Sequence, residues 1–491
     1  MTAAPSDSGE DLKALAKGGR TNVAGFLIRL IARIPFLIIG GQWYGAEALG
    51  RLAYAVIVVE FAAQIATLGL KRGLALHLSG KGRENGAWDG LVVVLLATLP
   101  LTLLLMAVPQ IMFPNSQINR LDNLLPLVIP ALAASDVMLT ALAYRFDVAS
   151  TVRARAIIEP WTISIAAFAL SWSLPRDGLL VAYALSMGAA FIASLIPFLK
   201  SYGLPKNWSP QPRRLGELAR RNAPLAAADA IEWGSRRLDL AILGLFASPA
   251  TVGIYWVAQQ IASLPQKLKT SFDPVLGPVI TRRLEEKDFP AIARQISQVG
   301  FWILAAQVGV ALALGIPAGG ILGLIGPDGS FVGGTGALAF LLAAEAIAAI
   351  AVVSEAALVY IARHRNMLLS LGMIGVQAGL TTGLLYVLKD GGWDEMSLAA
   401  AAAAGLCLAL ALGSIAKSLL ARRLLGAPVS VWRWPLIWAA AGGVLIGQIV
   451  IRLPEWAELA FGIPAILISY GWIIWKRGFQ AEDRLLFKRL A

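Results

Sequence analysis

Charged residues are scarce in this sequence of 491 residues, because only 15% are Asp, Glu, Lys or Arg while 57% are hydrophobic. Soluble globular chains average about 25% charged and about 45–50% apolar residues. The shortage of charge therefore excludes a soluble enzyme, a nucleic-acid-binding protein and a disordered chain, and it indicates a polytopic membrane protein. The net charge of +12 indicates basic cytoplasmic loops rather than a nucleic-acid partner.

Cysteine and histidine are almost absent. The single Cys407 cannot form an intrachain disulfide, and both histidines, His77 and His364, lie in basic loops. These residues offer no ligand set for zinc or for a redox centre, so we expect no metal and no cofactor. Residues 1–20 lack the apolar core of a signal peptide, so we expect the first apolar run to be a true membrane span.

Fourteen apolar runs are long enough to cross a bilayer, which takes about 20 helical residues. They lie at residues 21–43, 48–70, 88–112, 123–144, 156–174, 178–199, 223–247, 251–272, 295–316, 336–361, 367–388, 397–420, 434–452 and 458–475. The sequence therefore predicts an all-α polytopic membrane protein with 14 transmembrane helices.

The distribution of basic residues sets the orientation. If the N-terminus is cytoplasmic, 33 of the 42 Lys and Arg lie in or beside the inner loops and tails, and four lie in outer loops. This asymmetry is the one that the positive-inside rule requires, so both termini are predicted to be cytoplasmic. The outer loops are short, and the longest runs from about residue 317 to 335. They leave no room for a folded outer domain.

The spans divide into two halves and a terminal pair. We expect a cytoplasmic amphipathic segment at 1–20, an N-lobe of six spans with the central loop at 21–222, a C-lobe of six spans at 223–430, and spans 13 and 14 with the tail at 431–491. The stretch Arg33–Gly40 is similar to Arg237–Gly244, which lies 204 positions later. Since six spans separate the copies, the lobes are predicted to be a parallel repeat, although a second similarity, of residues 62–66 to 258–262, falls at a different offset.

Ionisable residues inside predicted spans are the candidate functional residues, because each costs about 2.5–3.5 kcal/mol at a bilayer centre on insertion scales. The candidate binding residues are Arg29, Arg33, Arg236 and Arg237, and the candidate coupling or gating carboxylates are Glu60, Asp229, Glu232, Asp239, Glu345 and Glu355. Arg29 and Arg33 lie one helical turn apart and have no carboxylate in their own span. With Arg237 they predict a cationic pocket for a diphosphate. For Glu232 and Arg236, a structural ion pair is an equally good interpretation.

Two short stretches carry a resemblance to a known family. Asp239–Phe246 followed by Val252–Tyr255, and Gly40–Gly45 followed by Ile65–Leu70, resemble segments of the bacterial oligosaccharide flippases of the multidrug/oligosaccharidyl-lipid/polysaccharide exporter superfamily. The resemblance implies two six-helix lobes around a central cavity and alternating access. The arginine–aspartate signature of the related peptidoglycan-lipid flippases is absent.

The resemblance implies a monomeric flippase in the bacterial inner membrane, not an enzyme. Its partners would be membrane lipids, the glycan polymerase or assembly machinery, and its substrate, an undecaprenyl-diphosphate-linked oligosaccharide moved to the periplasmic leaflet for surface polysaccharide synthesis. A cation-coupled multidrug antiporter, driven by H⁺ or Na⁺, remains the alternative, and it would depend on carboxylates instead of arginines. A membrane glycan polymerase or ligase is a third hypothesis, which the short outer loops disfavour.

Overall fold

The computed structural model describes residues 32–79, 85–205, 208–265, 280, 283–284, 286–480 and 483. Within these ranges all regular secondary structure is helical, and nine segments are long and apolar enough to cross a bilayer. The predicted all-α polytopic membrane fold is confirmed. The predicted segment 1–20 and Arg29 lie outside the described residues. The chain forms two compact units, and the boundary between them falls between Arg237 and Leu238.

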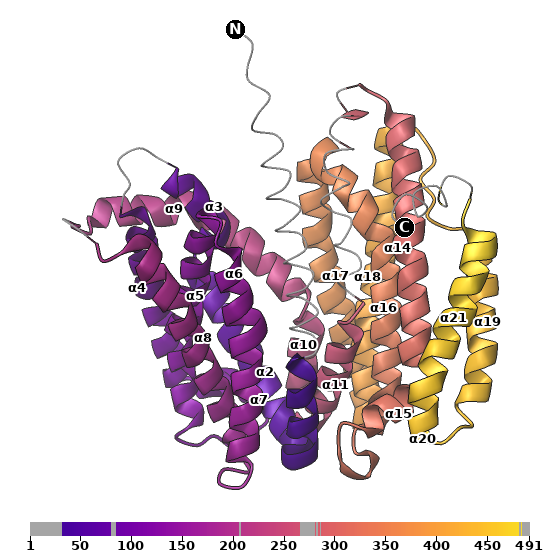
Figure 1. Cartoon of the computed structure of the whole chain (residues 1–491), viewed down its shortest axis with the longest axis horizontal. Helices are drawn as coiled ribbons and strands as arrows, with labels where there is room; N and C mark the ends of the chain where they lie inside the picture. The colour runs from indigo at the N-terminus through magenta and orange to yellow at the C-terminus, as the bar shows by residue number, and fades with distance from the viewer. Residues whose placement is uncertain are drawn as a thin grey trace. The chain divides into compact units, whose positions relative to one another are not determined.

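Unit 1 contains the first described helices (Figure 1, indigo to magenta). A helix from residue 32 runs into a π-helical turn, and Gly45, at φ +80°, separates it from the next helix. The elements are η1 (Gly40–Tyr44), α2 (Gly45–Ala66), α3 (Leu70–Leu78), α4 (Gly86–Ala107), η2 (Pro109–Ile111), η3 (Asp122–Leu127), α5 (Val128–Tyr144), α6 (Val148–Val152), η4 (Arg153–Ile158), α7 (Glu159–Leu170), α8 (Gly178–Tyr202) and α9 (Pro212–Ser235).

Helix α5 is the central helix of unit 1. It packs against α2, α3, α4 and α8, and its buried side chains include Ile129, Met138 and Leu142. Small residues between them, such as Ala133 and Ala134, are fully buried as well. In a membrane protein such residues allow close approach of helix backbones, which is where packing energy is gained.

Helix α9 differs from the prediction. The sequence analysis placed a loop at 200–222 and one span at 223–247, but α9 begins at Pro212 and ends at Ser235, and a separate helix begins at Leu238. The predicted lobe boundary at 222–223 therefore falls inside a helix. Proline is favourable in the first helical turn, because a backbone N–H at that position would have no acceptor within the helix and its absence costs nothing. One face of α9 is buried, and its residues are spaced by three or four positions: Leu215, Leu218, Asn222, Ala226 and Asp229. In the sequence this pattern is hard to recognise, because four arginines lie close to it.

Gly69 is required where α3 meets α9. Its φ is +72°, and an added Cβ would lie 2.6 Å from the Ala226 backbone nitrogen. We expect Gly69→Ala to destabilise the protein by about 2–4 kcal/mol, from the left-handed backbone and from overpacking. The matched control is Gly188→Ala in α8, where nothing lies within 4 Å of the added Cβ. Thermal unfolding in detergent should separate the two variants, and equal melting temperatures would contradict this role of Gly69.

Unit 2 begins at Leu238 (Figure 1, magenta to yellow). Its described elements are α10 (Leu238–Phe246), α11 (Pro249–Ala262), α14 (Phe289–Gly315), α15 (Ala318–Gly323), η5 (Pro327–Gly329), η6 (Val332–Gly334), α16 (Thr335–Ile361), α17 (Arg363–Asp390), α18 (Glu395–Leu425), α19 (Pro435–Val450), α20 (Glu455–Ala457), η7 (Glu458–Gly462), α21 (Ile463–Ile473) and η8 (Ile474–Gly478).

Small residues make the close helix contacts of unit 2. Helix α18 packs against both α16 and α17, and its buried residues are mostly alanine and glycine. At Gly405 an added Cβ would lie 2.9 Å from the backbone Cα of Thr381, so the two helix backbones nearly touch there. The predicted helix pair after residue 430 packs on α14, through a core that includes Phe301, Ala439 and Tyr470.

Asp483 ties the chain that follows this pair to α14. Its fully buried carboxylate accepts hydrogen bonds from Arg433 Nη1 at 2.7 Å, Gln298 Nε2 at 2.7 Å and Trp302 Nε1 at 3.0 Å. Burial raises the pKa of this carboxyl, but the bonds from Arg433 and Gln298 outweigh burial and hold the pKa below its ordinary value. The tie therefore stabilises the fold above the pKa of Asp483 in the unfolded chain, and it is lost as pH falls through the lowered folded-state pKa.

Candidate functional site

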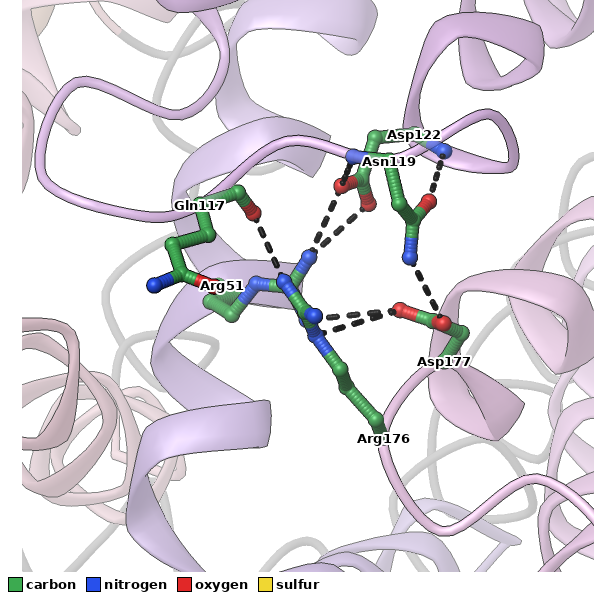
Figure 2. Close-up of polar contacts among 6 residues, drawn as sticks. All are labelled: Arg51, Gln117, Asn119, Asp122, Arg176 and Asp177. Carbon is green, nitrogen blue, oxygen red and sulfur yellow. Dashed lines mark hydrogen bonds and ion pairs between the residues drawn. The ribbon is translucent and has the colours of Figure 1, made fainter.

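A buried ion cluster around Arg51 joins three segments of unit 1 (Figure 2). Arg51 Nη2 lies 2.9 Å from both carboxylate oxygens of Asp122, and Arg51 Nη1 lies 3.4 Å from Asp177 Oδ1. The Asn119 side chain donates to Asp177 at 2.8 Å, and the Asn119 backbone N–H donates to Asp122 at 2.8 Å. Arg51 is 4% exposed and Asp122 is fully buried. We refer to Arg51, Asn119, Asp122 and Asp177 as the Arg51 cluster.

The Arg51 cluster is a structural tie. Arg51 is on α2, Asn119 precedes η3, and Asp177 immediately precedes α8, so the cluster holds the α4–η3 loop and the α7–α8 loop against α2. The sequence analysis missed it. A signal was available, because Arg51 stands inside the predicted span 48–70 and the two aspartates stand at the ends of other spans.

A second cluster lies around the π-helical turn η4. Arg155 contacts Asp136 of α5 and donates to Glu159 at 2.8 Å, and Lys71 Nζ lies 2.5 Å from the other oxygen of Asp136. Lys71 also donates to Gln64 Oε1 of α2. Single π-helical turns recur at functional sites, and here the turn aims Arg155 at two carboxylates. We call these five residues the Arg155 cluster.

A third cluster occupies the break between α9 and α10. Arg72 lies 2.7 Å from both Asp229 and Glu232 of α9, and Glu232 lies 3.2 Å from Arg236. Arg237 completes this break cluster. It lies 3.1 Å from Glu60 of α2, and its guanidinium stands over the ring of Trp233, 4.8 Å from the centroid.

The second and third clusters balance their charges. Together they contain five basic residues and five acidic ones: Lys71, Arg72, Arg155, Arg236, Arg237, Glu60, Asp136, Glu159, Asp229 and Glu232. Arg236 and Arg237, predicted as diphosphate ligands, are thus engaged by Glu232 and Glu60. Arg33 is exposed and makes no ion pair with any described residue. Arg29 lies outside the described residues, so the predicted three-arginine pocket remains a prediction.

The other predicted carboxylates, Asp239, Glu345 and Glu355, belong to unit 2. Asp239 is fully buried at the start of α10. It accepts a hydrogen bond from the Tyr255 hydroxyl, and Gln259 Nε2 lies 3.4 Å away, both from α11. Glu355 of α16 pairs with Lys417 of α18 at 2.9 Å. Glu345 is half-buried on α16. In the described part of the chain no group of three His, Cys, Asp or Glu side chains is arranged to hold a metal ion.

Solved structures of transporters share this fold. A multidrug resistance MATE family transporter of the MOP superfamily in an inward-facing conformation matches with a TM-score of 0.63 and 14% identity, over 81% of this chain and 94% of its own. The fold is that of MATE transporters. An outward-facing structure of such a transporter matches with a TM-score of 0.54 and 13% identity, over 84% of this chain and 96% of its own. The Vibrio cholerae MATE transporter VcmN, as a mutant, matches with a TM-score of 0.55 and 12% identity, over 84% of this chain and 98% of its own.

These matches show the fold, and they do not test the expected resemblance to the oligosaccharide flippases. No protein-family model matches the chain, and no curated protein sequence does. The neighbours are transporters and not enzymes, and the apolar helices agree with a multi-pass membrane protein. The cytoplasmic termini, the inner membrane and the lipid-linked substrate remain predictions.

Proposed function

We propose that this protein is a cation-coupled exporter that works by alternating access. The observation that carries the proposal is the shared fold, which extends over at least 94% of the length of each of the three transporters compared. Those named as multidrug resistance transporters suggest amphipathic organic cations as the substrate class. This is the alternative that the sequence analysis left open.

The charges of the two units fit this proposal better than a preformed anion pocket. In unit 1 the arginines nearest the helix break are neutralised by Glu60 and Glu232, so they offer an incoming diphosphate little free charge. In unit 2 the fully buried Asp239 is a suitable coupling residue. A carboxylate buried inside a span is costly when ionised, and binding H⁺ or Na⁺ offsets that cost. The Tyr255 hydroxyl and the Gln259 amide both contact its Oδ2 atom and orient the carboxylate.

Export of a lipid-linked oligosaccharide is the second candidate function. It is favoured by the helix pair α19 and α20–α21, since multidrug extrusion proteins usually have 12 spans and this chain has 14 predicted ones. The matched transporters also leave 16–19% of this chain without a counterpart, because they cover 81–84% of it. In addition, Arg33 remains exposed and available to a phosphate group. In this candidate, Glu60 and Glu232 would release Arg237 and Arg236 when the diphosphate enters.

Transport in proteoliposomes distinguishes the two candidates. The purified protein is reconstituted either with a fluorescent organic cation under an imposed pH or Na⁺ gradient, or with a labelled polyprenyl-diphosphate oligosaccharide whose leaflet position is followed. We expect gradient-driven movement of the cation. We also expect the Arg33→Ala/Arg237→Ala variant to retain it, because an exporter of cations does not need those guanidinium groups.

The controls decide the outcome. Arg120→Ala, which removes an exposed arginine from a predicted outer loop, should leave either transport unchanged. Translocation of the lipid-linked glycan, lost in Arg33→Ala/Arg237→Ala and kept in Arg120→Ala, would replace the exporter proposal with the flippase. Movement of neither substrate by protein that remains monodisperse would contradict both.

A further inference from the structure

The first three turns of α9 present a row of arginines that the fold does not use. Arg213, Arg220 and Arg221 are exposed and form no ion pair or hydrogen bond with any described residue. Arg213 and Arg220 lie on the side of α9 opposite its buried residues Leu215 and Leu218, and Arg221 lies to one side of them. Spacings of seven and eight residues place them along one stripe of the helix. We call Arg213, Arg220 and Arg221 the α9 arginine stripe.

Among the residues of unit 1 that the structure describes, most other basic side chains are engaged within the protein. Arg51, Lys71, Arg72, Arg155, Arg214, Arg236 and Arg237 each pair with a carboxylate. Glu217 lies within the α9 arginine stripe, yet it too forms no ion pair with a described residue. The stripe and Glu217 together carry a net charge of +2 on the exposed surface of α9.

The start of α9 is held firmly in place. Asp89 of α4 is 1% exposed. It accepts a hydrogen bond from Trp208 Nε1 at 2.9 Å and lies 3.0 Å from Arg214 Nε. Helix α9 packs on α2, α3 and α4, and in Figure 1 it crosses the end of the unit 1 helices rather than running parallel to them. A fixed helix presents its arginines in one orientation, so the stripe is a defined surface.

Aromatic side chains indicate the depth of this surface in the bilayer. Trp88 lies at the start of α4, Phe198 and Tyr202 lie at the end of α8, and Trp208 just precedes α9. They form a connected group, with ring centroids 5.1–6.3 Å apart for Trp88–Phe198, Phe198–Tyr202 and Trp88–Trp208. Trp and Tyr concentrate at the level of the lipid headgroups. We therefore expect the α9 arginine stripe to lie beside headgroups and not in the hydrocarbon core.

We propose that the α9 arginine stripe binds the phosphate groups of anionic phospholipids. A guanidinium donates hydrogen bonds to two phosphate oxygens at once, which gives it a stronger and more directional contact than an ammonium. A charged stripe on a helix that lies across the bundle end is suited to a lipid surface, because many headgroups reach it simultaneously. The proposal goes beyond the transported substrate, and it holds for either candidate function.

Hydrogen exchange in nanodiscs tests the proposal. The full chain is placed in phosphatidylcholine discs with and without phosphatidylglycerol, and amide exchange of residues 212–223 is followed by mass spectrometry. We expect phosphatidylglycerol to slow exchange in this segment for the wild type and to have at least fivefold less effect on Arg220→Gln/Arg221→Gln. Each basic residue beside an anionic surface accounts for about a fivefold change in affinity. Glu217→Gln should strengthen the effect.

The matched control is Arg120→Gln/Arg452→Gln, which removes two exposed arginines from other loops. It should respond to phosphatidylglycerol as the wild type does, and unchanged exchange in α5 will show that each variant is folded. An equal lipid response in Arg220→Gln/Arg221→Gln and wild type would overturn the proposal. So would protection by inorganic phosphate alone in phosphatidylcholine discs, since the ligand would then be a free anion.

Discussion

Replacing Arg51 by glutamine is expected to destabilise the protein by about 3–5 kcal/mol, because the change leaves a buried charge without its partner. Asp122 is fully buried, and both of its carboxylate oxygens accept a hydrogen bond from Arg51 Nη2. Water cannot replace the guanidinium there without opening the α4–η3 loop. A lower melting temperature in detergent, with faster proteolysis between residues 108 and 121, should accompany the change.

Arg236→Gln is the matched control for Arg51→Gln. Arg236 is also paired with a carboxylate, but both partners are more than half exposed, at 54% and 53%. Exposed pairs contribute about 0–1 kcal/mol, so this variant should unfold close to the wild type. The double variant Arg51→Gln/Asp122→Asn should recover part of the loss, since neither charge is then unpaired. Equal melting temperatures for Arg51→Gln and Arg236→Gln would show that the Arg51 cluster does not stabilise unit 1.

Replacing Asp239 by asparagine is expected to lower gradient-driven export by at least about tenfold, because the amide cannot bind H⁺ or Na⁺ by charge. A loss of only about 1.4 kcal/mol in cation binding is already a factor of ten. Tyr255→Phe should give a smaller loss, since it removes one hydrogen bond to the carboxylate and leaves the carboxylate itself in place. The measurement is initial export rate against the size of the imposed pH or Na⁺ gradient.

Glu355→Gln is the control for Asp239→Asn. Glu355 is a carboxylate of the same unit, but its side chain is 41% exposed and already paired with Lys417. Its removal should leave the dependence of export on the gradient unchanged. If Asp239→Asn retains the gradient response of the wild type, the coupling residue is a different one. The exporter proposal is tested separately, by the transport measurement in proteoliposomes.

Helix positions were largely predictable from this sequence, whereas the breaks within helices were not. An apolar run long enough to cross the bilayer must form a helix, because lipid offers no hydrogen-bond partners for the backbone N–H and C=O groups of an irregular or extended segment. The early start of α9 was missed because Arg213, Arg214, Arg220 and Arg221 interrupt the apolar run, although Leu215 and Leu218 keep the spacing of a buried face. The break comes directly after Gly234 and Ser235, a pair of the kind at which helices kink, and the ion pairs of Arg236 and Arg237 accompany it.

The charges show the same division between sequence and structure. That Glu60, Asp229, Glu232 and Arg237 stand inside apolar runs is visible in the sequence, and their cost in a bilayer marks them for attention. Their partners are not visible, because Arg72 meets Asp229 across 157 positions of the chain and Arg237 meets Glu60 across 177. Arg51 shows the limit most clearly, since nothing local connects it to Asp122 and Asp177.

The sequence by itself determined the class of this protein: a helical, multi-pass membrane chain. That its basic residues lie mostly on one side of the membrane remains a prediction. The sequence could determine the class because hydropathy is a property of short segments, and the bilayer acts on each segment separately. Only the tertiary structure decided which arginines are neutralised, by Glu60 and Glu232 among others, and which are left exposed on α9 without an ion pair to any described residue. Pairing depends on the distance between side chains of different helices, and packing alone sets that distance.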